Sequence, residues 1–243
     1  MTAREIHEND IGALSDWFES RPINKKSRQS LAAVILSNLD FVGMDWARSR
    51  DGSSPGNDIK MLDYACGPGF LSEIFGPYVS SICAIDASPI MIEKYNAKQS
   101  NFGIDPTKVR AVQADWLSSP FESTSCYPDE FHDFDLVTVG AALHHFPDAQ
   151  EAIRLLAARL KPGGVLYIQD RAAQKGNVMI SNKSRSKRTM QGFEKESLGE
   201  FMSRAGLVDF SWFIVPQEFN VELPSEEVTS ISCFLARAMK PLA

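Results

Sequence analysis

A glycine-containing turn between an apolar run and a helical stretch constrains this chain more than any other feature. The apolar run ends at Tyr64, the turn contains Gly67 and Gly69, and the helical stretch begins near Phe70. Because glycine has no Cβ atom, the backbone at these two positions can turn sharply and a ligand can lie against it. Similar turns also join strands to helices in proteins that bind nothing there. The turn alone therefore predicts only a strand, a tight loop and a helix.

Short apolar runs alternate with helical stretches through the middle of the chain. An amphipathic stretch at 149–160 precedes the last run, and the Lys-Pro-Gly-Gly sequence at 161–164 supplies a helix stop and a turn. Strands and helices in alternation predict an α/β fold with a mostly parallel sheet. The apolar runs cover residues 60–64, 81–85, 108–112, 136–139 and 165–169.

The two ends of the chain extend this pattern. Apolar residues recur at helical spacing from 10 to 41, which predicts an N-terminal helical layer, and the polar residues 47–58 predict a loop before the first strand. Residues 194–205 predict a helix, and residues 210–215 and 230–236 predict two strands of a closing hairpin. With the five central runs, these strands predict a doubly wound, seven-stranded, mostly parallel sheet with helices on both faces.

Composition and charge exclude several classes of function. Of the 243 residues, 44% are hydrophobic and 23% are charged, which is typical of a globular protein with one sizeable core. No stretch is long and apolar enough to cross a bilayer, so we expect no membrane partner. The formal net charge of −6 would repel a phosphate backbone, so we expect no nucleic-acid partner. The charged residues at 1–8 disfavour a signal peptide and predict a cytoplasmic protein.

Cysteine spacing gives no sign of a metal centre. The four cysteines, at positions 66, 83, 126 and 233, are spread along the chain without a C-x-x-C pair. This spacing disfavours a zinc site and a disulfide framework. We therefore expect reduced thiols and no bound metal.

Acidic residues follow the second and third apolar runs. Asp86 ends the second run, and Asp115 follows the third. The carboxyl ends of parallel strands meet at one edge of a sheet, where an acid such as Asp86 can hold ribose hydroxyls. Asp115 is placed to accept a hydrogen bond from an adenine amine. Either acid alone is more typical of a solvated strand end or a helix cap than of a ligand site. In register after successive strands, and with the glycine turn, the two acids predict a nucleoside site.

With these motifs in place, the chain resembles the class I S-adenosylmethionine (SAM)-dependent methyltransferases that act on small molecules. The first motif of that family is an acidic residue followed by x-G-x-G-x-G. Here it begins at Asp63, and Ala65 stands in place of the first glycine. The resemblance covers residues 60 to 170. The further matching segments are 85–91, 114–115, 134–137, 143–148 and 160–164.

The resemblance implies SAM as the cofactor. It places Gly67 and Gly69 beside the methionine part of SAM and Asp86 at the ribose. Ala87 and Met91 would flank the adenine, although Met91 at helical spacing suits a core contact equally well. The residues implied in cofactor binding are Asp63, Ala65, Gly67, Gly69, Asp86, Ala87, Met91, Asp115, Trp116, Gly140 and Trp17.

Two alternatives bear on these assignments. The segment 15–20 is similar to an aromatic and acidic element that many small-molecule members place over the methionine end of SAM. Trp17 would then shield the site from water. The alternative is that Trp17 and Phe18 only pack between helices. A nicotinamide-binding domain would also have a glycine turn, but its fingerprint requires a third small residue, glycine or alanine, where this chain has Ser72.

The fourth apolar run leads through Gly140 to two adjacent histidines, His144 and His145. In the resembled family this segment passes beneath the transferred methyl group, and a neutral imidazole suits proton removal from an acceptor at cellular pH. Adjacent histidines on an irregular segment usually point in different directions. We predict that His144 faces the acceptor, while His145 better fits the alternative in which the rings only hydrogen-bond the loop.

The resemblance predicts an enzyme that transfers a methyl group from SAM to a small-molecule acceptor by in-line displacement. The alternative is a SAM-binding regulatory or scaffold protein without transferase activity. We predict a single domain, 1–243, with an N-terminal helical cap and linker (1–57), a SAM-binding core (58–170), and an acceptor-side insertion with the C-terminal hairpin (171–243). The basic run at 183–188 fits a site for an acidic acceptor, a solvated loop or a nuclear import signal.

Overall fold

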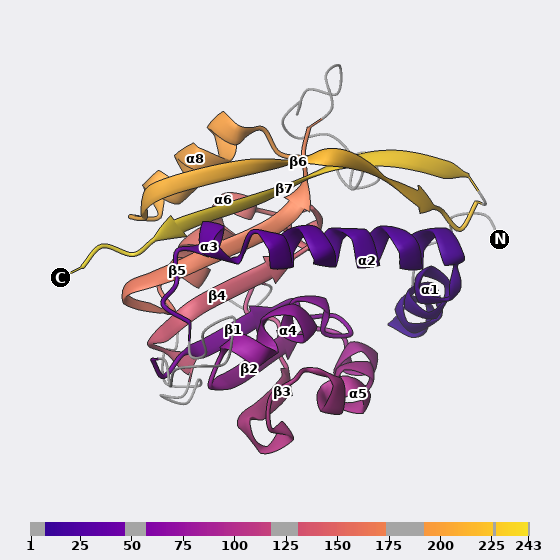
Figure 1. The fold of residues 1–243 in the computed structure, drawn as a ribbon, viewed down its shortest axis with the longest axis horizontal. Helices are drawn as coiled ribbons and strands as arrows, with labels where there is room; N and C mark the ends of the chain where they lie inside the picture. The colour runs from indigo at the N-terminus through magenta and orange to yellow at the C-terminus, as the bar shows by residue number, and fades with distance from the viewer. Residues whose placement is uncertain (1–7, 47–56, 118–130, 174–191, 226, 243) are drawn as a thin grey trace.

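The computed structural model of the protein describes residues 8–46, 57–117, 131–173, 192–225 and 227–242. Within these residues, seven strands form one sheet in the order β3-β2-β1-β4-β5-β7-β6 (Figure 1). β7 is antiparallel to β5 and β6, and the other pairings are parallel. The predicted seven-stranded, mostly parallel sheet is confirmed. The strands are β1 (Lys60–Tyr64), β2 (Ser81–Asp86), β3 (Val109–Gln113), β4 (Phe134–Gly140), β5 (Leu160–Arg171), β6 (Val208–Glu222) and β7 (Val228–Met239).

Helices cover both faces of this sheet, as expected for a doubly wound fold. α2 (Pro22–Ser37), α4 (Phe70–Phe75) and α5 (Pro89–Lys98) lie on one face (Figure 1). α6 (Ala149–Ala157) and α8 (Lys195–Arg204) lie on the other. The α/β fold with helices on both faces is therefore confirmed.

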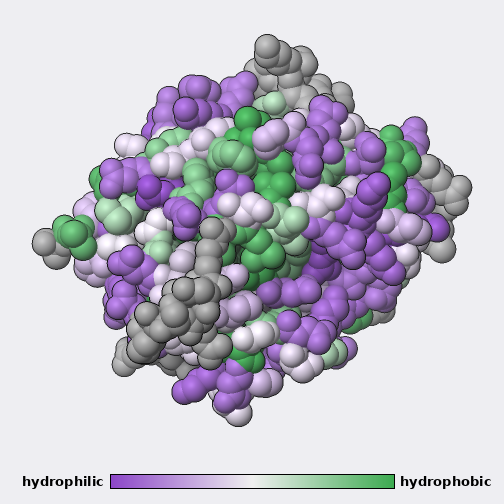
Figure 2. All heavy atoms as spheres, in the orientation of Figure 1, coloured by the Kyte–Doolittle hydropathy of each residue, from purple (hydrophilic) through white to green (hydrophobic). Residues whose placement is uncertain are grey.

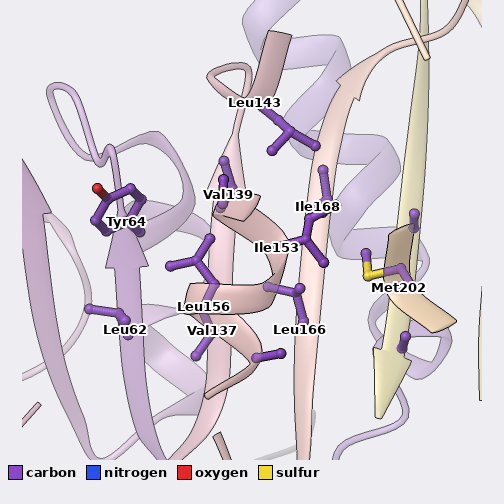
Figure 3. Packing of buried hydrophobic residues seen from close by; sticks show 14 of the residues in the cluster. Leu62, Tyr64, Val137, Val139, Leu143, Ile153, Leu156, Leu166, Ile168 and Met202 are labelled. Atoms are coloured by element: carbon purple, nitrogen blue, oxygen red, sulfur yellow. The ribbon is translucent and has the colours of Figure 1, made fainter. Parts of the chain in front are cut away.

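Two apolar clusters fill the space between the sheet and its helices. On one side, Leu62, Val137 and Leu166 of the central strands pack against Leu156 of α6 and Met202 of α8 (Figure 3). Each of these side chains is at most 1% exposed, and burial of one such side chain contributes about 1.5–3 kcal/mol. Because successive side chains of a strand point to opposite faces, the neighbouring strand residues face the second cluster, beneath α2 and α4. The central strands are thus buried on both faces and give a rigid support at their carboxyl ends.

The predicted N-terminal helical layer consists of separate helices rather than one continuous stretch. α1 (Glu8–Ser20) ends before Pro22, which begins α2 because proline suits the first turn of a helix and not its interior. α3 (Leu39–Val42) follows α2 and ends at Gly43, whose φ of 76° is left-handed. The break at proline lets α1 fold back towards α5 while α2 packs against β6.

The second half of the sheet differs from the prediction in extent. β6 and β7 contain 15 and 12 residues, so the closing hairpin is much longer than the two predicted runs. Residues 161–164, predicted as a turn, lie within the bounds of β5. There Gly163 has a φ of 79°, and the pairing of β4 with β5 shifts between Phe134 and Leu136. The glycines therefore make an irregularity in a strand. The basic run at 183–188 lies outside the described residues.

Hydrophilic residues cover most of the face in view in Figure 2, and hydrophobic residues reach the surface in its middle. The structure shows no helix, in the parts of the chain that it describes, with the length and apolar character needed to cross a membrane. Cys66, Cys83 and Cys233 are buried free thiols, and Cys126 lies outside the described residues.

Candidate active site

A cavity of about 240 Å³ lies at the carboxyl ends of β1, β2 and β3 and beside the segment that follows β4. Ligands of open α/β sheets bind at this edge, at the point where the strand order reverses. Here the chain leaves β3 at one edge of the sheet and continues in β4 on the other side of β1. The lining residues are Tyr64, Ala65, Ile85, Asp86, Ala87, Ala114, Asp115, Leu117, His145, Phe146 and Pro147.

The two glycines of the turn after β1 have different surroundings. Both are left-handed, with φ of 51° at Gly67 and 93° at Gly69. A Cβ atom at Gly67 would have no neighbour within 4 Å, whereas one at Gly69 would lie 2.5 Å from the Phe102 ring. Gly67 therefore borders open space that a ligand can fill, and Gly69 allows the turn to pack on the core.

Ala65 occupies the position where the family pattern has its first glycine. Its φ is 53°, and it lines the cavity. A left-handed conformation costs a non-glycine residue about 1–2 kcal/mol, so the fold stores strain at this point of the site.

Asp86 lies where the cavity meets the glycine turn. Its carboxylate accepts hydrogen bonds from the backbone N–H groups of Gly67 and Ser88, each 2.9 Å long. Burial raises the pKa of the Asp86 carboxyl, and these two N–H donors oppose that rise. Asp86 thus fixes the turn and lines the cavity at the same time, which agrees with its predicted place.

Asp63 lies beneath the turn and is 1% exposed. Its carboxylate accepts hydrogen bonds from the backbone N–H and the hydroxyl of Ser72, at 3.2 and 2.7 Å, and from the hydroxyl of Thr138 at 3.1 Å. Burial raises the pKa of Asp63 to about 7. The side chain is not part of the cavity lining, so Asp63 ties β1, β4 and α4 together below the site.

Of the predicted cofactor residues that follow β2 and β3, some line the cavity and one lies in the core. Ala87, which the resemblance implies at the adenine, and Asp115, which follows the third apolar run, both line the cavity. Trp116, also predicted to bind the cofactor, is 1% exposed. Its ring stacks on Tyr64 with centroids 5.4 Å apart, and its backbone N–H donates to the Tyr64 hydroxyl at 3.2 Å. Trp116 therefore supports a cavity residue from behind.

Three other predicted cofactor residues lie outside the cavity lining. Met91 is buried at 8% exposure, in agreement with the alternative of a core contact. A Cβ atom at Gly140 would lie 2.9 Å from Leu71, so this glycine permits close packing of β4 on α4. The Trp17 ring contacts Phe18 edge-on and lies beneath the Arg21 guanidinium, 4.6 Å from the ring centroid. None of these three residues lines the cavity that contains Asp86.

The two histidines lie in the short 3-10 helix η6 (Leu143–His145), and their placement is the reverse of the prediction. His145 lines the cavity, whereas the His144 side chain is 1% exposed and its Nδ1 lies 2.6 Å from the Asp170 carboxylate. Burial is the main cause that lowers the pKa of His145, to about 4, and the neighbouring His144 lowers it further by electrostatic repulsion. His145 is therefore a neutral imidazole near pH 7.

Sequence reasoning did not single out several of the residues that form this site. Most of them are apolar residues at strand ends, which a sequence cannot separate from core residues. Asp170 had a usable signal, because it is an acid near the end of the fifth run as Asp86 is at the end of the second. The cavity residues that were missed are Tyr64, Ile85, Ala114, Leu117, Phe146 and Pro147.

The residues fit a cofactor that contains adenosine. The absence of a side chain at Gly67 leaves open space beside the turn, into which a Cβ atom would project. The carboxylates of Asp86 and Asp115 can accept hydrogen bonds from hydroxyl and amine groups, and apolar side chains supply walls for a planar base. Fold and site together define a doubly wound α/β protein of the nucleoside-binding class.

The particular family follows from comparison with known proteins. A family model described as "Methyltransferase domain" matches residues 30–211, and the chain belongs to that family. The predicted membership in the class I SAM-dependent methyltransferases is thereby confirmed.

Curated relatives are similar over part of their length. The chain is 32% identical over 120 residues to the uncharacterized methyltransferase YcgJ of Bacillus subtilis, a match that covers 49% of this chain and 44% of that protein. It is 30% identical over 135 residues to a ubiquinone biosynthesis O-methyltransferase of Xanthomonas campestris, covering 55% of this chain and 50% of that protein. The matches span half or less of the length of these relatives.

Solved structures share the fold at low sequence identity. The crystal structure of YcgJ has a TM-score of 0.59 and 17% identity, and the alignment covers 86% of this chain and 98% of that one. The N-methyltransferase NodS of Bradyrhizobium japonicum, in complex with S-adenosylhomocysteine (SAH), has a TM-score of 0.52 and 18% identity, with coverages of 93% and 91%. The cyclase SpnF has a TM-score of 0.57 and 17% identity, with coverages of 86% and 82%.

Proposed function

We propose that this protein transfers a methyl group from SAM to a small-molecule acceptor. The observation that carries the proposal is the cavity at the strand ends, where Asp86 presents a carboxylate beside Gly67, whose backbone N–H donates to it and which borders open space. SAM supplies a methyl group on a positively charged sulfur, which is already activated for displacement. The protein then has to hold the acceptor in line with that methyl group, and such positioning is worth about 7–11 kcal/mol.

The cavity residues have distinct roles in this proposal. Asp86 accepts hydrogen bonds from the ribose hydroxyls, and Asp115 accepts one from the adenine amine. Ala87 contacts the adenine, while Ala65 and Gly67 border the methionine part. The other residues implied by the family resemblance lie outside the cavity lining, and we assign them to the packing of the fold around it: Asp63, Gly69, Met91, Trp116, Gly140 and Trp17.

His145 is the imidazole that we propose to meet the acceptor, with His144 behind it. His145 lines the cavity, and its pKa of about 4 keeps the ring neutral at cellular pH. A neutral imidazole nitrogen can take a hydrogen bond or a proton from an alcohol, phenol or ammonium acceptor. Because its pKa of about 4 lies well below cellular pH, this imidazole is a weak proton acceptor, and we assign it mainly the role of accepting a hydrogen bond that orients the acceptor.

The acceptor that we propose is a small molecule in the cytoplasm. The net charge of −6 disfavours a nucleic-acid substrate. We propose a single domain in which residues 58–170 bind the cofactor. The N-terminal residues 1–57 and the C-terminal residues 171–243 then lie towards the acceptor.

One experiment tests the proposed activity. The purified protein is incubated with SAM labelled in its methyl group and with a metabolite extract, and mass spectrometry identifies the molecules that gain the label. We expect at least one labelled small molecule with the parent protein and none with the Gly67→Val variant. SAM binding without label transfer to any molecule would contradict the proposal and would favour a regulatory or scaffold protein, since the fold also serves other chemistries.

A further inference from the structure

β5 presents a buried carboxylate that the cofactor assignments leave unused. Asp170 is 0% exposed and accepts hydrogen bonds from the backbone N–H and the ring Nδ1 of His144, at 3.2 and 2.6 Å. It also accepts one from the backbone N–H of Arg171 at 2.7 Å. β5 lies beside β4, with Gln169 paired to Gly140, so Asp170 lies directly against the turn that follows β4. The carboxylate therefore holds both the backbone and the ring of His144.

These hydrogen bonds determine which His144 nitrogen carries the proton. A carboxylate accepts hydrogen bonds and donates none, so Nδ1 of His144 must be the protonated nitrogen. Nε2 of the same ring is buried and has no hydrogen-bond partner among the described residues. Most buried polar atoms have a hydrogen-bond partner, so Nε2 is an exception. Among the described residues, the hydrogen bond that holds the His144 ring is the one at Nδ1.

The His144 ring lies against the ring of His145. Their centroids are 3.9 Å apart, and the ring planes meet at 42°. Of the two, His145 is the one that lines the cavity. In a close-packed interior a ring in this contact restricts the rotation of its neighbour. A fixed His144 therefore limits the orientations that His145 can take towards the cavity.

We infer that Asp170 is a positioning residue for the acceptor side of the cavity. It holds His144 in the Nδ1–H tautomer, and His144 in turn holds the His145 ring in the cavity wall. This inference rests on the proposed function, because it concerns the same site. Asp170 acts through the two histidines and does not itself reach the cavity.

The tautomer of His144 in the parent protein is the first test. The chain has four histidines, so their ring signals can be assigned in a two-dimensional ¹H–¹⁵N long-range spectrum of ¹⁵N-histidine-labelled protein, with single histidine variants for identification. We expect His144 to be protonated at Nδ1 near pH 7. A His144 ring protonated at Nε2 alone would overturn the inference, with no need for any Asp170 variant to fold.

The second test compares Asp170→Ala with a matched variant, Asp135→Ala. Asp135 is also a buried carboxylate, but it lies near the opposite end of β4. It accepts a hydrogen bond from the backbone N–H of Lys60 and forms an ion pair with the side-chain ammonium of Lys161. We expect Asp170→Ala to release the His144 tautomer, shift the His145 ring signals and lower kcat by about 10²-fold. SAH affinity should stay within about threefold. Asp135→Ala should lower the thermal midpoint without these effects.

The outcomes separate this inference from the proposed activity. If Asp170→Ala leaves the His144 tautomer and the His145 signals unchanged, Asp170 is only a structural residue and the inference is wrong. If the signals change as expected and kcat does not fall, the positioning role is also wrong. If no acceptor is methylated by the parent protein, the proposed function fails, while the spectra still decide whether Asp170 orients the two rings.

Discussion

Replacement of Asp86 by alanine separates a cofactor residue from an ordinary strand-end acid. In the structure the Asp86 carboxylate accepts hydrogen bonds from the backbone N–H groups of Gly67 and Ser88 and also lines the cavity. The variant loses the acceptor for both N–H groups and the acceptor for the ribose hydroxyls. We therefore expect effects on the turn and on cofactor binding.

The size of each effect follows from these contacts. A hydrogen bond to a charged group contributes about 1.5–3 kcal/mol. Loss of the ribose contact should therefore weaken SAM and SAH binding by roughly 10- to 150-fold, since about 1.4 kcal/mol corresponds to a factor of ten. The free energy of unfolding should fall by about 1–3 kcal/mol, because the Gly67 and Ser88 N–H groups lose their partner.

Calorimetric titration with SAH measures the first effect, and denaturant unfolding measures the second. Asp105→Ala is the matched control, because Asp105 is an exposed acid outside the cavity lining whose carboxylate accepts hydrogen bonds from the backbone N–H and the hydroxyl of Thr107. We expect this control to bind SAH like the parent. If Asp86→Ala also binds SAH within about twofold of the parent, the carboxylate does not hold the ribose and the assignment is wrong.

The remaining predictions concern the turn, the buried acid and the histidines. Gly67→Val should abolish SAH binding, because its side chain enters the open space beside the turn, and it should also lower stability because φ at Gly67 is 51°, while circular dichroism still shows a folded protein. Gly69→Ala should lower stability through the 2.5 Å contact with Phe102. Retained SAH binding by the valine variant would contradict the assignment of Gly67 to the cofactor. The pKa of Asp63 is raised from 3.8 to about 7, so the folded state binds this proton more tightly than the unfolded chain does. Stability should therefore fall by about 3 kcal/mol as the pH rises from 4 to 7. Urea unfolding at several pH values should show a weaker pH dependence of the free energy of unfolding for Asp63→Asn. An unchanged pH dependence would show that Asp63 is not its cause. His145→Ala should lower kcat by about 10²-fold, the scale for a lost orienting contact, and more than His144→Ala; normal turnover of both would show that the rings only support the loop. Because the pKa of His145 is about 4, kcat of the parent should not change through this group between pH 6 and 8, and a group titrating near pH 6.5 in the rate profile would contradict its assignment.

The sequence predicts the cavity residues that follow from topology. Asp86, Ala87 and Asp115 come directly after apolar runs, and parallel strands bring their carboxyl ends to one edge. The position of these residues in the chain is therefore enough to place them together. The same rule applies to Asp170, which shows that the fifth strand end was informative too.

The sequence does not predict which side chains at these ends face the ligand. His144 and His145 differ by one position in a short 3-10 helix, and the choice between them depends on Asp170, which lies far along the chain. Likewise, Gly67 and Gly69 look alike in the motif, and only the packing of Phe102 separates them. These choices are made by tertiary contacts, which a motif does not contain.

The choice of cofactor is the central claim, and titration of the parent protein with SAH and, separately, with a nicotinamide dinucleotide tests it most directly. We expect SAH to bind with an affinity in the micromolar range and the dinucleotide to give no heat. SAM should compete with SAH for the same site. Clear binding of the dinucleotide with no heat from SAH or SAM would contradict the assignment of this cavity.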